Sequence, residues 1–121
     1  MLKLLHKGDE SQRGWKIIEV SRARDAAYLP QLLARLDSDE THHNKRHIVR
    51  ALGNIGGDRA EARLLELLQT STGLMLSDVI RSLGRLRSRK AAARIRSLLN
   101  HEMERVRQDA TWAMRRITGE K

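Results

Sequence analysis

The chain has 121 residues, enough for one domain with its own core, and its lack of Cys excludes a disulfide framework, a cysteine nucleophile and a cysteine zinc site. Hydrophobic residues make up 40% of the sequence, but Phe is absent and only Trp15, Trp112 and Tyr28 are aromatic, which favours helices over a β-sandwich. The net charge of +9 indicates an acidic partner, and nucleic acid, an anionic protein surface and a lipid headgroup layer all fit it.

The sequence contains no candidate membrane segment. No stretch approaches the roughly 18 consecutive apolar residues of a transmembrane helix, and the N-terminal MLKLLHKGDE has too few apolar residues for a secretory signal. The lack of Cys fits a reducing compartment. These features predict a cytoplasmic protein that does not enter a membrane.

Apolar residues at helical spacing predict a series of helix pairs, beginning at the N-terminus. Residues 1–7 share the apolar pattern of residues 65–69, so they are predicted as a partial second helix that caps the array. Residues 12–37 are predicted as the first complete pair. Pro30 falls in the first turn of the second helix of that pair, where proline is tolerated.

The next pair, residues 42–69, shows the pattern most clearly. Two sets of apolar residues follow the i, i+3, i+4 spacing of an amphipathic helix, and Gly56 and Gly57 separate them with a turn. The sets are Ile48, Ala51, Leu52 and Ile55, then Ala60, Leu64, Leu67 and Leu68. A further pair is predicted over 74–100, and a closing half repeat over 103–118.

Two segments of the chain have similar sequences. Residues 50–68 and 81–99 match at eight of 19 positions when they are aligned at an offset of 31. The equivalent apolar position recurs at Val20, Leu52, Leu83 and Met114. The sequence therefore predicts an all-α fold, an α-α superhelix: one short HEAT-like α-solenoid domain over 1–121 with about 3.5 helical-hairpin repeats of 31–32 residues.

The repeat resembles the HEAT-like repeat of the phycobilisome-lyase type over residues 12–118. Its first half is carried by Val106-Arg107, Ala110, Ala113-Met114 and Ile117 in the last unit; its second half is carried by Ala60, Leu64, Leu65 and Leu68. The Val-Arg dipeptide opens only the last unit. The resemblance implies the solenoid fold, whereas its functions range from bilin lyases to scaffolds and nucleic-acid-binding modules.

No catalytic, cofactor-binding or metal-binding residue is predicted. His42, His43 and His47 lie together, and His43 with His47 has the i, i+4 spacing that can chelate a metal, but no further ligand accompanies them except Asp39 and Glu40. These histidines are interpreted as solvent-exposed residues at a helix start. The pair His101-Glu102 is predicted in a loop and does not occupy the mid-helix place of the His-Glu pairs in HEAT-like di-iron hydroxylases.

Arginines recur on the outward positions of the predicted first helices. Because these helices stack side by side, the arginines should form a ridge that can hold phosphates or carboxylates. The candidate binding surface comprises Arg46, Arg50, Arg81, Arg85, Trp112, Arg115 and Arg116. Two other interpretations stay open: a solvated helix face, and a Trp112 ring that covers the end of the core. The second helices have a nearly neutral outer face, expected to be the concave side.

These observations favour a non-catalytic HEAT-like scaffold or adaptor that binds a protein partner with an acidic surface. Nucleic-acid binding through the arginine ridge is one alternative, with affinity from phosphate contacts and little sequence readout. A phycobiliprotein bilin lyase or phycobilisome-associated factor is the other, and only the family resemblance implies it. Self-association through the partial units at the two ends is also compatible with the sequence.

Overall fold

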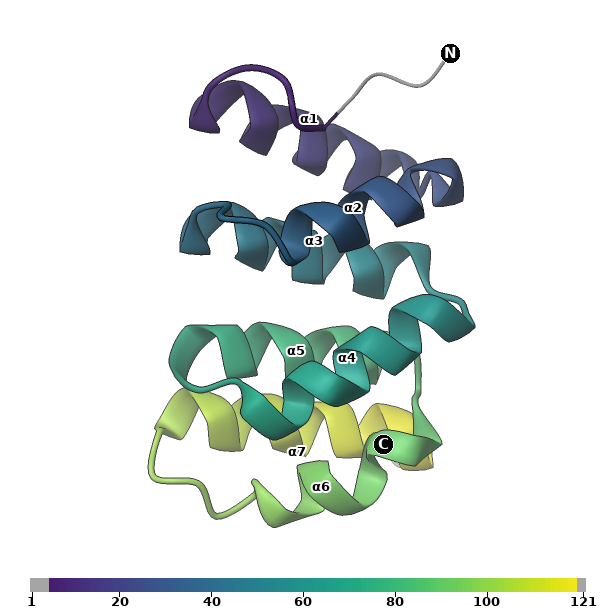
Figure 1. Ribbon diagram of the computed structural model, residues 1–121. Coiled ribbons are helices and arrows are strands. Elements are labelled where there is room, and N and C mark those ends of the chain that lie inside the picture. Colours follow the sequence, from purple (N-terminus) through teal and green to yellow (C-terminus); the bar gives the residue numbers. More distant parts are fainter. Residues whose placement is uncertain (1–4, 120–121) are drawn as a thin grey trace.

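The computed structural model describes residues 5–119, which form two layers of helices joined by short turns (Figure 1). The α-helices are α1 (Glu10–Ala23), α2 (Leu29–Leu36), α3 (His42–Ile55), α4 (Asp58–Thr70), α5 (Gly73–Arg85), α6 (Ala92–Ser97) and α7 (Glu104–Thr118). Short 3₁₀ turns η1 (Ala26–Tyr28) and η2 (Arg89–Ala91) precede α2 and α6. The described part of the chain has no β-strand, so the predicted all-α HEAT-like solenoid is confirmed.

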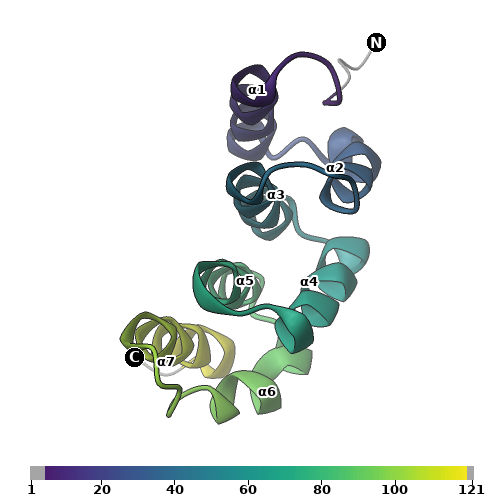
Figure 2. The same cartoon turned by 60° about the vertical axis from the view of Figure 1, so that its left-hand side comes forward.

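The odd-numbered helices α1, α3, α5 and α7 form one layer, and the even-numbered helices form the other (Figure 2). The stack bends toward the odd-numbered layer in Figure 2, so the odd-numbered helices line its concave side. The expectation of a concave second-helix side is therefore wrong. None of the helices described over 5–119 is long and apolar enough to cross a membrane.

Local sequence explains where several helices begin. At α1, Asp9 accepts a hydrogen bond from the Gln12 N–H at 2.9 Å, and the Gln12 side chain accepts one from the Asp9 N–H at 2.9 Å, which is a capping box. At α3, Thr41 Oγ1 accepts from the Asn44 N–H at 3.2 Å. These side chains satisfy backbone donors that the first turn of a helix leaves unpaired.

The turns after α1, α3 and α5 each contain a residue with a positive φ angle. Arg24, Gly56 and Arg87 occupy equivalent positions and have φ angles of 52°, 74° and 54°. Arg24 is left-handed, with a ψ of 41°, whereas Gly56 has a ψ of −160°, a combination that glycine alone adopts readily. The glycine turn was therefore visible in the sequence, and the two arginine turns were not.

Leu and Ile side chains from both layers fill a continuous core. Ile17, Leu52 and Leu83 on the odd-numbered helices are fully buried, as are Leu32 and Leu64 on the even-numbered ones. Burial of each such side chain contributes about 1.5–3 kcal/mol. The predicted partial helix over 1–7 falls partly on residues 1–4, outside the described residues, and residues 5–7 form a turn and no helix. Leu5 is nevertheless buried, and its N–H donates to Gln31 Oε1 on α2 at 2.9 Å.

The Leu-Gly pairs of the repeated segments 50–68 and 81–99 have a packing role. A Cβ atom on Gly53 would lie 2.6 Å from the Ser82 Cβ of α5, and a Cβ on Gly84 would lie 2.7 Å from Cζ3 of Trp112 on α7. Glycine at these positions lets consecutive odd-numbered helices approach closely. This spacing fixes how the outward side chains of neighbouring repeats meet.

Candidate functional site

The outward face of the odd-numbered helices carries most of the predicted arginine ridge. We call Arg46, Arg50, Arg81, Arg85, Trp112 and Arg116 the arginine surface. Arg46 and Arg50 lie on α3, Arg81 and Arg85 lie on α5, and the other two residues lie on α7. Each is partly buried, so the surface is an ordered array of side chains and differs from a fully solvated face.

Arg46 and Arg50 both pair with an aspartate of the next repeat. Nε of Arg46 lies 2.5 Å from one carboxylate oxygen of Asp78, and Nε of Arg50 lies 3.5 Å from the other. Only 5% of the Asp78 side chain is exposed. The two guanidiniums therefore share one buried negative charge, and Asp78 ties α3 to α5.

Arg81 repeats this arrangement one unit further along. NH1 of Arg81 donates to Oδ1 of Asp109 at 3.0 Å, and the Ser77 hydroxyl donates to Oδ2 of the same carboxylate. Asp109 occupies on α7 the position that Asp78 occupies on α5. The inter-repeat Arg-Asp pair is thus a periodic feature that binds consecutive helices together.

Trp112 lies between two guanidiniums. The Arg81 guanidinium lies 4.5 Å from the centre of the indole ring, and the Arg116 guanidinium lies 5.3 Å from it. The indole also packs over Gly84, whose carbonyl accepts a hydrogen bond from Nε of Arg116 at 3.3 Å. Trp112 therefore orders both arginines through cation–π contacts and is itself partly buried.

Arg85 differs from its neighbours because it lacks a partner. Its NH1 is buried without a hydrogen bond, and no residue over 5–119 forms an ion pair with it. Burial lowers the pKa of Arg85, and the positive charges of Arg81 and Arg50 lower it further, while Asp78 offsets this in part. The site holds a positive charge that the described residues do not neutralise.

A cavity of about 300 Å³ borders Arg85. We call it the arginine cavity, and it lies where α1, α3 and the end of α5 meet. Its lining residues are Ile18, Ser21, Arg22, His47, Arg50, Asn54 and Arg85. Three guanidiniums around so small a space make it suited to an anion.

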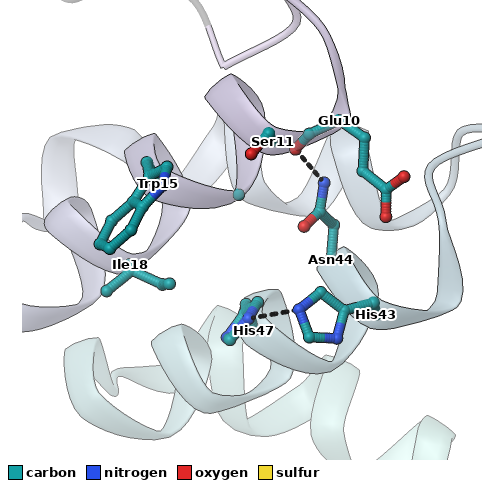
Figure 3. Close-up of a pocket in the computed structure, with 8 residues that line it drawn as sticks. Glu10, Ser11, Trp15, Ile18, His43, Asn44 and His47 are labelled. Carbon is teal, nitrogen blue, oxygen red and sulfur yellow. Dashed lines mark hydrogen bonds between the residues drawn. The ribbon is translucent and has the colours of Figure 1, made fainter.

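A second cavity, of about 390 Å³, lies between α1 and α3 (Figure 3). We call it the aromatic cavity. It is lined by Glu10, Ser11, Gly14, Trp15, Ile18, His43, Asn44 and His47. Trp15 is 68% exposed, unusual for an indole. The two cavities share Ile18 and His47, so they adjoin on one face.

The sequence analysis missed the aromatic cavity. A signal for it exists in the sequence, because Trp15 lies 32 residues before His47 and 63 before Asp78, at the equivalent position of the repeat. An aromatic side chain at a position that is polar in the other repeats indicates a local function for that surface.

His43 and His47 form a hydrogen-bonded pair in the aromatic cavity. Their Nε2 atoms lie 3.2 Å apart, and their rings are nearly perpendicular at 87° (Figure 3). NH1 of Arg50 lies 3.2 Å from Nδ1 of His47. Burial and then the charge of Arg50 lower the pKa of His47, which favours the neutral imidazole. Over residues 5–119, no three His, Cys, Asp or Glu side chains come together as metal ligands.

Arg115 lies at the edge of the arginine surface. It is exposed on α7 and borders, with Leu99, Thr111 and Met114, a cavity of about 410 Å³ beside α6. It also lines a cavity of about 510 Å³ together with Trp112. Because Arg115 and Arg116 point about 100° apart on the helix, Arg116 contacts the Trp112 indole and Gly84 while Arg115 points toward α6.

A charged cluster around Glu40 also escaped the sequence analysis. Its carboxylate is fully buried and accepts hydrogen bonds from Nε of Arg13 at 2.8 Å, Nε of Arg35 at 2.9 Å, and both the Asn44 side chain and the Thr41 N–H. Burial alone would raise the pKa of Glu40, but these bonds lower it to about 2. This Glu40 cluster joins α1, α2 and α3 and holds the aromatic cavity in shape.

The fold is that of a HEAT-like repeat protein with an arginine-rich concave face. Comparisons with known proteins identify the type of one repeat. Residues 45–70 match the model of the PBS lyase HEAT-like repeat. The chain is thus a HEAT-like repeat protein carrying a repeat of the PBS lyase type, as the resemblance predicted. A search of curated proteins gave no significant match.

A solved structure shares the fold. It is the complex of CpcE and CpcF of phycocyanin lyase from Nostoc sp. PCC7120, whose matching chain superposes with a TM-score of 0.66 at 20% sequence identity. The match covers 97% of this chain and 63% of the lyase chain, so our protein spans less than two thirds of that chain's length.

These comparisons correct the functional expectation. The interpretation as a non-catalytic scaffold for an acidic protein partner is wrong: the matching repeat model is that of the PBS lyase HEAT-like repeat, and the similar solved structure is a phycocyanin lyase complex. Net charge led to the error, since a basic face attracts any anion and does not identify it. The alternative based on family resemblance is the one that the comparisons favour.

Proposed function

We propose that the protein serves the attachment of bilins to phycobiliproteins or their removal, and that it binds the bilin on the concave face. The observation that carries this proposal is the adjoining pair of cavities on that face, in a chain with a PBS lyase HEAT-like repeat. A bilin is an open-chain tetrapyrrole with a flat conjugated system and two propionate groups. It needs an apolar, aromatic surface and a basic one side by side.

The two cavities offer these surfaces. Trp15 and Ile18 present apolar area beside the two imidazoles, and the arginine cavity begins at the shared residues Ile18 and His47. Together the cavities measure roughly 690 Å³, within the range of pockets that hold small molecules. The bilin would lie across α1 and α3 with its carboxylates toward α5.

A protein partner is part of the proposal. The similar structure is a complex of CpcE and CpcF, and this chain spans 63% of the lyase chain that it matches. We propose that this protein likewise works beside a second HEAT-like chain, which would cover the open side of the bilin. The chain has no Cys, so it would hold the bilin non-covalently while the phycobiliprotein supplies the acceptor thiol.

The direct test is an absorbance titration of the isolated protein with phycocyanobilin. The expected result is saturable binding with a shifted spectrum, about tenfold weaker in Trp15→Ala, because the indole would cover one face of the conjugated system. Leu74→Ala is the matched control, since Leu74 is also an exposed apolar residue, 45% accessible, but borders neither cavity.

The second measurement follows the chromophore on a phycocyanin subunit. Addition of the protein to the apo-subunit with phycocyanobilin, or to the pigmented subunit, should change the rate at which covalent bilin appears or disappears. If the protein neither binds phycocyanobilin nor alters either rate, the proposal is wrong.

A further inference from the structure

We propose that Arg85, with Arg50 and Arg22, forms an oxyanion subsite that binds a propionate carboxylate of the bilin, and that Arg46 and Arg81 are not part of it. This inference rests on the proposed function for the identity of the ligand. The subsite itself is argued from the pairing, burial and charge of the guanidiniums.

Arginines that look alike in the repeat differ in their partners. Arg46 is held by Asp78 at 2.5 Å, and Arg81 is held by Asp109 at 3.0 Å and by the indole of Trp112. Their charges are already neutralised by buried carboxylates. An incoming carboxylate would have to compete with these intramolecular ones, so these two arginines serve to join the repeats.

Arg85 has the opposite environment. No carboxylate of residues 5–119 lies within ion-pair distance of it, and its NH1 is buried without an acceptor. The Arg85 guanidinium therefore has no counter-charge within the fold, and the part of the side chain that borders the arginine cavity is where an oxyanion would supply one. The nearest guanidiniums, those of Arg81, Arg50 and Arg116, add repulsion that a bound anion would relieve.

The anion would bind in the arginine cavity. Arg85 and Arg50 line it from α5 and α3, and Arg22 lines it from the end of α1. Arg50 lies 3.5 Å from Asp78, a looser contact than the 2.5 Å of Arg46, and unlike Arg46 it borders the cavity. Asn54 adds an amide whose Nδ2 donates to the Ser21 hydroxyl at 2.8 Å, which fixes that wall. Because Ile18 and His47 connect this cavity to the aromatic cavity, a carboxylate here would belong to a ligand whose flat body lies beside Trp15.

The experiment compares Arg85→Gln with Arg59→Gln, which removes the same charge from an exposed position on α4. Thermal unfolding is measured with citrate or inorganic phosphate against NaCl of equal ionic strength. At about ten times its Kd, citrate should raise the Tm of the wild type and of Arg59→Gln by about 5 °C. Arg85→Gln should show no such shift.

The second arm uses phycocyanobilin and its dimethyl ester, which lacks the carboxylates. We expect the free acid to bind the wild type about 10- to 100-fold more tightly than the ester, and Arg85→Gln to bind both equally weakly. Arg85→Lys keeps the charge but loses the planar fork, so its affinity should fall between the two. Far-UV circular dichroism checks that each variant is folded.

The outcomes separate the subsite from the proposed function. If Arg85→Gln responds to citrate as the wild type does, the oxyanion subsite is wrong. If the ester binds the wild type as tightly as the free acid, bilin handling stands and carboxylate recognition by Arg85 is overturned. If citrate binds through Arg85 but phycocyanobilin does not bind at all, the subsite stands and its assignment to a bilin is overturned.

Discussion

Two clusters of arginines in this protein handle charge in different ways. At Glu40, two guanidiniums and two further donors converge on one fully buried carboxylate. On the arginine surface, the carboxylates of Asp78 and Asp109 pair with Arg46, Arg50 and Arg81, whereas Arg85 and Arg116 form no ion pair with residues 5–119. In the Glu40 cluster the carboxylate is fully hydrogen-bonded, whereas on the arginine surface the guanidiniums outnumber the carboxylates.

The difference separates a structural cluster from a binding surface. The buried Glu40 carboxylate already accepts hydrogen bonds from four groups of the fold, so it is not available to a ligand. Its removal would leave two guanidiniums without a counter-charge. An unpaired guanidinium beside a cavity is retained at a cost to stability, which is the pattern of a functional site. Substitutions in the two clusters should therefore differ in both the size and the sign of their effect on stability.

The largest effect is expected for Glu40→Gln. This change removes the charge that Arg13 and Arg35 share and should destabilise the protein by about 3–5 kcal/mol at pH 7, as for other broken buried pairs. Urea unfolding measures it. The control Glu102→Gln lies on an exposed residue of the α6–α7 loop and should change stability by less than about 0.5 kcal/mol.

The stability that the Glu40 cluster contributes should depend on pH. The pKa of Glu40 falls to about 2 in the folded state, below the roughly 4.3 of an unfolded chain, so ionised Glu40 stabilises folding above pH 4. That stability, about 3 kcal/mol, should be lost as the pH falls from about 4.5 to 2. Wild type and Glu40→Gln should therefore converge at acid pH; a constant gap would contradict the assignment.

Gly53→Ala should have the next largest effect. The added Cβ would lie 2.6 Å from the Ser82 Cβ and 2.8 Å from the Ser82 Cα, so α3 and α5 must move apart. Overpacking of this kind costs about 1–3 kcal/mol and outweighs the helix propensity of Ala, about 1 kcal/mol, so we expect a net loss of about 1 kcal/mol. The separation should also loosen Arg46 from Asp78. A variant as stable as the wild type would show that the helices are less tightly packed than described.

Asp78→Asn should destabilise by about 1 kcal/mol, less than Glu40→Gln, because Arg46 and Arg50 keep some access to water. It also frees two guanidiniums on the arginine surface, so citrate should bind several-fold more tightly. Calorimetric titration at low and high salt measures this. Unchanged citrate affinity would mean that Asp78 does not limit the charge available to ligands.

Arg85→Gln should have the smallest effect and the opposite sign. The charged guanidinium is partly buried, repelled by its neighbours and unpaired, so its neutralisation should stabilise the protein by up to about 1 kcal/mol at pH 7. The gain should shrink in about 1 M NaCl, where screening weakens the repulsion from Arg81 and Arg50. A clear loss of stability would show that Arg85 has a structural role.

The sequence by itself determined the secondary structure and the fold class. The spacing of Ile48, Leu52 and Ile55, and the return of the pattern after 31 residues, express a local rule: each helix must bury one face against its neighbours. Such a rule can be read without coordinates because it depends on residues within a few turns of one another. The arginines of the first helices could be placed on the outer face by the same reasoning.

Only the tertiary structure decided which charges are free. The sequence placed both Arg46 and Arg85 on the outer face of the first helices, yet one contacts an aspartate 32 residues away and the other contacts none among residues 5–119. Glu40 meets Arg13 across 27 residues, and Trp15 meets the His43–His47 pair across the α1–α3 contact. These pairings depend on the distance between packed helices and the direction in which the stack bends. A residue pattern within one repeat specifies neither, because both arise from how consecutive repeats fit together.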